Sequence, residues 1–172
     1  MNNRPEKTEY AQYYERYISL VEELDIVAAL ANQLREMESL FAGIAEEKGS
    51  LRYAADKWTI KQLVGHLSDG EKIFAYRALR ISRGDQTPIE GFEQDGYVEN
   101  GNFEQARLAD LVEEFSLLRR ANILAFGNLT NNAWTRTGTA SDKAVSVRAL
   151  AYIMVGHVRH HLNILKERYL IK

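Results

Sequence analysis

The chain has 172 residues and a formal net charge of −2, with 45% hydrophobic and 27% charged residues, a composition typical of a soluble globular domain. This length suits one domain over residues 1–172, and no cluster of Lys and Arg indicates nucleic acid as a partner. Cysteine is absent, which excludes disulfides, thiolate nucleophiles on the protein and cysteine-based zinc sites.

The N-terminal residues are polar and lack the apolar segment of a signal peptide. No apolar run approaches the roughly 20 residues that a membrane-spanning helix needs. We therefore expect a cytoplasmic protein without a membrane partner. Residues 1–24 form an N-terminal extension that we expect to pack on the outside of the main fold, with a short helix in its tyrosine-rich part.

Four segments show the apolar spacing of amphipathic helices. The first covers about residues 26–44, behind the N-cap residue Asp25. The second begins after Thr59, which forms a capping-box pattern with Gln62 and follows Trp58, and it ends at Gly84. Trp58 is most simply a core or cap residue, as is Trp134.

A long connection, about residues 85–101, follows the second helix and is rich in glycine and acidic residues. The third helix is predicted to open at a capping-box-like sequence, residues 102–105, and to close at Gly127 or Asn128. A polar stretch, residues 130–143, is interpreted as a loop. Ser146 then caps a fourth helix that runs to about Tyr169. These elements predict an all-α four-helix bundle with a long crossover connection between helices two and three.

The histidines carry the strongest chemical signal. There are four in the chain: His66 in the second helix, and His157, His160 and His161 in the fourth. A rotation of about 100° per residue turns His157 and His161 toward the core and His160 toward the polar face. Two imidazoles at i and i+4 can reach one metal ion, and His66 lies on the flank of the apolar stripe of its own helix.

Three neutral imidazoles with an open coordination position are typical of a catalytic metal site and suit zinc, nickel, iron or copper. We expect zinc or nickel. The alternative is that each histidine is a hydrogen-bonded core or rim residue. No glutamate stands three residues before a histidine, which excludes a carboxylate-bridged di-iron bundle. Val158 follows His157, so the His-Glu-x-x-His pattern of zinc proteases is absent.

Other candidates are weaker. Glu71 and His160 could orient a ligand or move a proton, although Glu71 could equally form an ion pair with a nearby arginine. Arg77, on the His66 side of its helix, could hold a substrate carboxylate, with Arg80 as a less well placed neighbour. Asp95, in the long connection, could approach the open end of the bundle or be solvated. Gly70 follows His66 by one turn and leaves room for a ligand. The sequence therefore predicts His66, His157 and His161 as the metal ligands, with His160, Glu71 and Arg77 as candidates beside them.

Several short motifs resemble the DinB-like superfamily of metalloenzymes. They are Arg52-Tyr53, Lys57-Trp58-Thr59-Ile60-Lys61, Gly65-His66-Leu67, Glu71, Tyr76-Arg77-Ala78-Leu79, Arg83-Gly84-Asp85, Gly156-His157, His160-His161 and Glu167-Arg168-Tyr169. The resemblance covers about residues 15–170. It implies a four-helix bundle, a divalent metal bound by His66, His157 and His161, and frequent homodimers.

The resemblance also implies similarity to transferases and isomerases that use bacillithiol, mycothiol or glutathione. We therefore expect a metal-dependent S-transferase or isomerase that uses a low-molecular-weight thiol on a small-molecule substrate. A metal-dependent hydrolase is the alternative enzyme. The non-enzymatic alternatives are a bundle whose histidines bind metal only to hold two helices together, and a dimeric stress-response protein that binds metal. A sealed site with a fourth protein ligand would favour a non-enzymatic protein, and an open position on a cavity would favour an enzyme.

Overall fold

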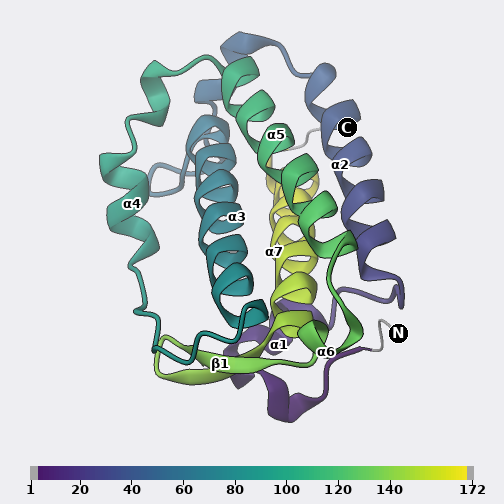
Figure 1. Cartoon of the computed structure of the whole chain (residues 1–172). Coiled ribbons are helices and arrows are strands. Elements are labelled where there is room, and N and C mark those ends of the chain that lie inside the picture. Colours follow the sequence, from purple (N-terminus) through teal and green to yellow (C-terminus); the bar gives the residue numbers. More distant parts are fainter. Residues whose placement is uncertain (1–3, 170–172) are drawn as a thin grey trace.

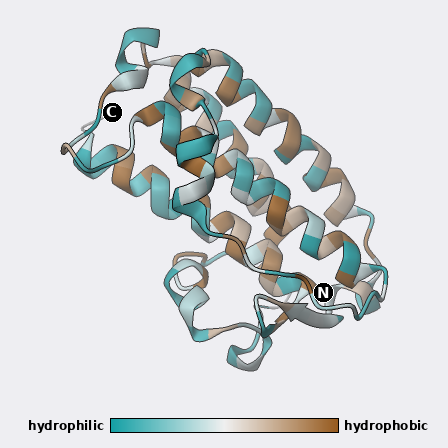
Figure 2. Cartoon of the chain, turned by 90° about the vertical axis from the view of Figure 1, so that its left-hand side faces the viewer, coloured by the Kyte–Doolittle hydropathy of each residue, from teal (hydrophilic) through white to brown (hydrophobic). Residues whose placement is uncertain are grey.

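The structure is a computed structural model that describes residues 4–169. Four long helices run along the molecule (Figure 1): α2 (Ile26–Ala42), α3 (Ile60–Ser82), α5 (Leu108–Gly127) and α7 (Val147–Arg168). They correspond to the four predicted segments, and the prediction of a four-helix bundle is confirmed. In Figure 2 polar and apolar residues alternate around these helices, as expected when one side of each is buried.

Shorter elements connect and cover the bundle. Among the described residues these are α1 (Glu15–Ile18), α4 (Gln94–Asn100), α6 (Asn131–Trp134), strands β1 (Thr137–Ala140) and β2 (Lys143–Ser146), and the 3₁₀ turns η1 (Lys7–Glu9), η2 (Gln12–Tyr14), η3 (Glu46–Ser50) and η4 (Phe103–Gln105). The two strands pair antiparallel, with Thr137 opposite Ser146. The hairpin closes one end of the bundle beside α1 and α6 (Figure 1).

Most of the predicted helix caps are confirmed. The Asp25 carboxylate accepts a hydrogen bond from the Ala28 amide at 3.0 Å. Thr59 and Gln62 form both bonds of the capping box, at 2.9 and 3.2 Å. The Ser146 hydroxyl accepts from the Ala149 amide at 3.0 Å. These caps could be predicted because each residue bonds a backbone group three positions along the chain.

The predicted start of the third helix was wrong. Asn102 adopts a left-handed conformation with φ 54° and caps nothing, so residues 103–105 form only a 3₁₀ turn. Helix α5 begins at Leu108, whose amide donates to both carboxylate oxygens of Glu46, at 2.8 and 3.0 Å. A residue 62 positions away therefore caps this helix, and no local pattern could reveal it.

Two predicted loops contain regular structure. Residues 130–143 hold α6 and strand β1, so interpreting this stretch as a loop was wrong. The hairpin turns at Ser141 and Asp142, both with positive φ, as a two-residue turn of type I′ requires. The long connection carries α4, and Ile89 is tied to the hairpin by backbone bonds with Thr139 and Ser141, each 2.9 Å. These partners lie about 50 residues away in the chain.

The order of the helices around the bundle decides which faces meet. α3 packs against α5 and α7, and α2 packs against the same two helices. α2 and α3 therefore lie at opposite corners although they follow each other in the chain (Figure 1). The connection that carries α4 lies outside α3 and allows α5 to return beside it. This arrangement places α3 directly against α7, the two helices that carry the histidines.

The core has two apolar clusters with a polar layer between them. One lies toward the hairpin and includes Ile18, Leu30 and Ile153. The other lies toward the opposite end and includes Met37, Leu67 and Leu162. The N-terminal segment packs against α7 and contributes to the first cluster, so it is part of the core rather than only a cover.

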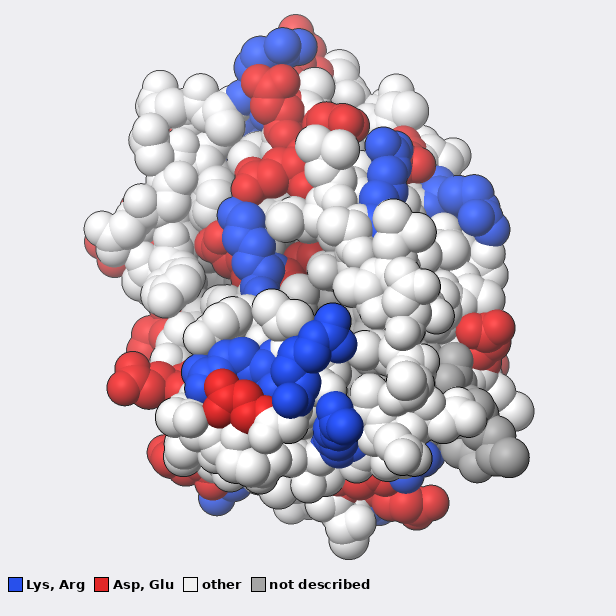
Figure 3. Space-filling view, in the orientation of Figure 1, with Lys and Arg blue, Asp and Glu red and all other residues white. Residues whose placement is uncertain are grey.

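On the face shown in Figure 3, basic and acidic side chains lie next to one another. Several ion pairs join partly exposed side chains of the molecule, such as Lys72 with Glu114 at 2.7 Å. Among the described residues, no helix combines the length and the apolar character needed to cross a membrane.

Candidate metal centre

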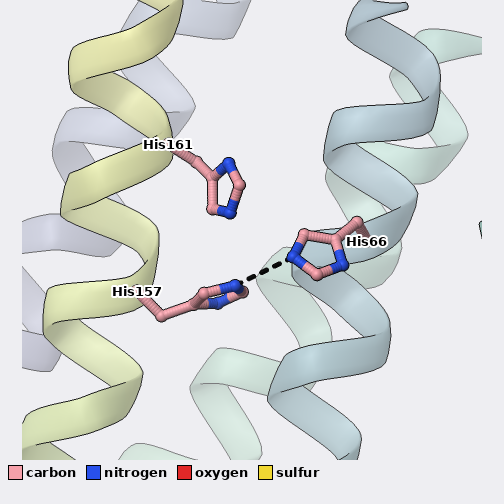
Figure 4. A group of neighbouring side chains, drawn as sticks. All are labelled: His66, His157 and His161. Carbon is pink, nitrogen blue, oxygen red and sulfur yellow. Dashed lines mark hydrogen bonds between the residues drawn. The ribbon is translucent and has the colours of Figure 1, made fainter. Parts of the chain in front are cut away.

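Three histidines meet between α3 and α7. His66 projects from α3, and His157 and His161 project from successive turns of α7 (Figure 4). One ring nitrogen from each lies within 4.8 Å of the others. The Nε2 atoms of His66 and His157 are 2.9 Å apart. Residues that are 91 positions apart in the chain thus form one cluster of nitrogen donors.

All three imidazoles are buried, with 3%, 4% and 9% of their surfaces exposed for His66, His157 and His161. Burial lowers the pKa of His66 to about 4, although the negative charge of Asp95 opposes that shift. Burial also lowers the pKa of His157 and of His161 well below the usual range, and the neighbouring imidazoles lower both further. The rings are therefore neutral at neutral pH, with lone pairs free to bind a metal.

The donor set fits a divalent transition metal. Neutral imidazole nitrogens suit zinc, nickel, copper and iron. With metal–nitrogen bonds of about 2.0–2.1 Å, two ligands of a tetrahedral ion lie roughly 3.3 Å apart. The 2.9 Å separation of the His66 and His157 nitrogens requires only a small opening to reach that value. Among residues 4–169, no Asp or Glu joins this group as a fourth ligand.

Aromatic rings surround the cluster. Trp58 lies 4.8 Å from the His66 ring and is stacked at 6.5 Å on His161, measured between ring centroids. Tyr17 and Phe74 meet His157 edge-on, at 5.3 and 5.8 Å. Trp58 therefore does more than cap its helix, because it also shields two of the histidines. Its position just before Thr59 gave no signal of this role.

Two glycines allow the close approach. A Cβ atom on Gly70 would lie 3.0 Å from Cε1 of His157, so this position leaves room for the ring of His157 itself. A Cβ on Gly156 would lie 2.1 Å from the carbonyl oxygen of Tyr17. Gly156 thus lets the N-terminal segment lie against α7 beside His157. In the sequence, Gly156 stands out only as part of the Gly156-His157 motif.

A cavity of about 350 Å³ opens beside the cluster. His66 and His157 line it, together with Gly70 between them in space. The remaining walls come from the N-terminal segment, α3, the long connection and the hairpin: Tyr13, Tyr14, Tyr17, Phe74, Phe92, Glu93, Gln94, Asp95 and Ser141. Asp95 therefore lines the cavity, which is one of the two positions predicted for it. Its negative charge opposes the lowering of the His66 pKa by burial.

The other predicted site residues have different surroundings. His160 is half-buried, with its ring 5.1 Å from His161 and 5.6 Å from Tyr17. Burial lowers its pKa, and the charge of Arg16 adds to that shift. His160 thus borders the cluster without belonging to the group of donors.

Glu71 is not brought to the histidines. Its carboxylate accepts two hydrogen bonds from Arg119, at 2.7 and 2.9 Å, and one from Asn122 at 2.9 Å. Both Glu71 and Arg119 are buried. The alternative considered from the sequence, an ion pair with an arginine, is therefore confirmed.

Arg77 forms hydrogen bonds with residues of the cavity wall but does not itself line the cavity. It donates to the Ser141 hydroxyl at 2.9 Å, to the Glu90 carbonyl at 3.2 Å and to the Tyr14 hydroxyl at 3.5 Å. Its Nε atom has no partner among the described residues. Arg77 therefore ties the hairpin and the long connection to α3. Arg80 pairs with Asp85 at 2.6 Å and does not line the cavity.

Comparison with known proteins agrees with this architecture. Residues 29–165 match the DinB superfamily. The chain belongs to the DinB superfamily. No curated protein matches the sequence. The structure is similar to YfiT from Bacillus subtilis, described as a probable metal-dependent hydrolase with an unusual four-helix bundle topology. The TM-score is 0.72 at 15% identity, with 99% of this chain and 95% of YfiT covered, which establishes a shared fold.

Proposed function

We propose that this DinB-superfamily protein is a metal-dependent enzyme that binds a divalent ion through His66, His157 and His161. The observation that carries the proposal is the position of three neutral imidazoles beside a cavity of about 350 Å³. This volume is at the small end of the range for ligand pockets and suits a small-molecule substrate. The description of YfiT as a probable metal-dependent hydrolase is consistent with this class of activity.

A catalytic role is favoured over a structural one. Structural zinc normally has four protein ligands, whereas catalytic sites keep a position open. Within residues 4–169 the cluster offers three donors, and two of the histidines line the cavity. This geometry is also evidence against a stress-response protein in which the metal would serve only to join two helices.

We propose hydrolysis as the reaction. A divalent ion in this cluster would acidify a bound water and polarise a carbonyl or phosphoryl oxygen. Asp95 is the carboxylate best placed to accept the proton of the attacking water, because it lines the cavity and interacts with His66. Trp58 and Tyr17 pack against the imidazoles and limit how they can rotate.

Thiol transfer is the second candidate. The chain has no cysteine, so a thiolate nucleophile would have to come from a low-molecular-weight cosubstrate. A divalent metal favours the deprotonated form of a coordinated thiol, and the cavity opens beside the metal site. This reaction differs from hydrolysis in its strict need for an added thiol.

One set of assays separates these reactions. Protein purified without a histidine tag is analysed for metal, then assayed before and after chelation against a panel of esters, amides and phosphoesters. The same samples are tested for conjugation of monochlorobimane with glutathione, bacillithiol and mycothiol. We expect hydrolysis that is lost with the metal, restored by zinc or nickel, and reduced about 100-fold or more in Asp95→Asn. Turnover that persists in metal-free protein would refute the proposal, and turnover that requires a thiol would select the second candidate.

The oligomeric state is a separate proposal. We propose a homodimer, as expected from the resemblance described above. Analytical ultracentrifugation at several protein concentrations should give about twice the monomer mass of 19.7 kDa.

A further inference from the structure

The cavity beside the histidines is walled by aromatic rings. Five of them form an aromatic cage, defined as Tyr13, Tyr14, Tyr17, Phe74 and Phe92. Tyr14 neighbours three of the other rings, with its centroid 5.3 Å from Tyr13, 6.4 Å from Tyr17 and 6.3 Å from Phe74. Phe92, which belongs to the long connection, also lines the cavity. Such rings offer π-electron density to a ligand from several directions.

The charged side chains that line this cavity are acidic. Glu93 and Asp95 line it, and within residues 4–169 no Lys or Arg does. Among residues 4–169 neither carboxylate is seen in an ion pair or a side-chain hydrogen bond, in contrast to Glu23, Glu71 and Asp85. We call Glu93 and Asp95 the rim of the cavity. Their negative charges are therefore not neutralised by an ion pair with the protein.

Two arginines contact tyrosines of the cage without lining the cavity. The Arg16 guanidinium lies 3.7 Å from the centroid of Tyr13 but does not line the cavity. Arg77 reaches the Tyr14 hydroxyl at 3.5 Å. The contact of Arg16 shows that a tyrosine of the cage already binds a cation through its ring.

We propose that the substrate carries a protonated or quaternary amine, which lies in the aromatic cage near Glu93. Aromatic faces combined with carboxylates attract a cation and repel an anion. Tyr17 and Phe74 contact His157, so the amine lies against the other rings of the cage, Tyr13, Tyr14 and Phe92. The reactive group of the same molecule faces His66 and His157. The placement of the reactive group rests on the function proposed above, whereas selection of the amine rests on the cage and the rim.

A pair of probes of the same shape tests this selection. Choline and 3,3-dimethylbutan-1-ol differ in charge, since a quaternary nitrogen in one replaces a carbon in the other. Their dissociation constants are measured by NMR titration of the zinc-loaded protein, and zinc content is measured on the same sample. We expect choline to bind about tenfold more tightly. Equal binding, or tighter binding of the neutral probe, would overturn the inference.

Variants locate the selectivity. Glu93→Gln removes one rim charge, and Phe92→Leu removes one aromatic face while keeping an apolar side chain. Each should reduce the preference for choline by about fivefold. The matched controls are Glu99→Gln in α4 and Tyr76→Leu in α3, which do not line the cavity and should leave the preference unchanged. An unchanged preference in both Glu93→Gln and Phe92→Leu would place choline elsewhere and refute the site.

Zinc content and the preference for choline test two different proposals. A sample that binds no zinc but still prefers choline would refute the metal proposal and support the amine site. A sample that binds one zinc but does not prefer choline would refute the amine site and leave the metal proposal intact.

Discussion

Two groups of buried polar side chains lie between the apolar clusters, and they differ in where their partners are. Arg119 donates to Glu71 at 2.7 and 2.9 Å and to Gln33 at 2.9 Å, and Gln33 in turn donates to the Val155 carbonyl at 2.8 Å. The charges and hydrogen-bonding groups of this network find their partners within the protein. The residues of this network come from α2, α3, α5 and α7. Leaving one of its buried charges unpaired would cost free energy, so the network holds these four helices together.

The histidine cluster has fewer such partners. His66 and His157 share one hydrogen bond between their Nε2 atoms, which are 2.9 Å apart, and no other side-chain hydrogen bond to the three imidazoles is seen among residues 4–169. The nitrogen atoms of the cluster face one another and a cavity, and the nearest rings are aromatic. Burial keeps the imidazoles neutral, so each loses little by lacking a counter-ion. The difference indicates that the Arg119 network maintains the fold, whereas the histidines are available to a ligand. Four predictions test this distinction.

The largest effect is expected at the histidine cluster. His157→Ala and His66→Ala should each weaken zinc binding by more than about 100-fold, since loss of groups that only support a ligand already costs 10- to 100-fold. Activity should be lost with the metal. Competition with a chromogenic chelator gives the affinity, and urea unfolding of the metal-free variants shows whether they are folded. Full metal content in both variants would exclude the three-histidine site.

The Arg119 network should show the opposite behaviour. Glu71→Gln leaves the Arg119 charge buried without a counter-charge and should lower the free energy of unfolding by about 3 kcal/mol, with zinc affinity unchanged. Glu38→Gln is the matched control, because Glu38 pairs with Arg120 at the surface, and it should cost less than about 1 kcal/mol. Both values come from urea denaturation. If Glu71→Gln reduced zinc affinity more than stability, Glu71 would belong to the site.

Gly70 should separate metal binding from stability. In Gly70→Ala the added methyl group must displace the His157 ring, so zinc affinity should fall about tenfold. The free energy of unfolding should not fall in parallel, because alanine is preferred over glycine inside a helix by about 1 kcal/mol. Gly96→Ala, in α4, has no atom within 4 Å of the new methyl group and serves as the control. Equal zinc affinity in the two variants would contradict this prediction.

The smallest effect concerns an ion pair at the edge of the fold. A hydrogen bond from Arg159 lowers the pKa of Glu23 to about 2. Because the folded state favours the charged carboxylate, the pair stabilises the protein above about pH 4.5, and this contribution is lost as the pH falls toward 2. Both side chains are partly exposed, so the contribution should be below about 1 kcal/mol. The difference in unfolding free energy between the protein and Glu23→Gln should therefore shrink from pH 6 to pH 3, and a constant difference would contradict the assignment.

Much of the local structure could be predicted from the sequence. The four long helices follow from apolar spacing, and the caps at Asp25, Thr59 and Ser146 follow from side chains that bond backbone groups three residues away. The inward direction of His157 and His161 follows from helical geometry alone. These features depend on residues that are close together in the chain, so they can be predicted from the sequence.

Only the tertiary structure decided how these elements meet. The diagonal placement of α2 and α3 brings His66 to α7, and Glu46 caps α5 from 62 residues away. Trp58 reaches His161 and Tyr17 reaches His157 by packing, and Glu71 pairs with Arg119 rather than with the site. Each of these contacts joins residues that are distant in the chain, and their pairing depends on how the four helices minimise exposed apolar surface together. The sequence determined which side chains point inward, and the packing determined which of them share a site.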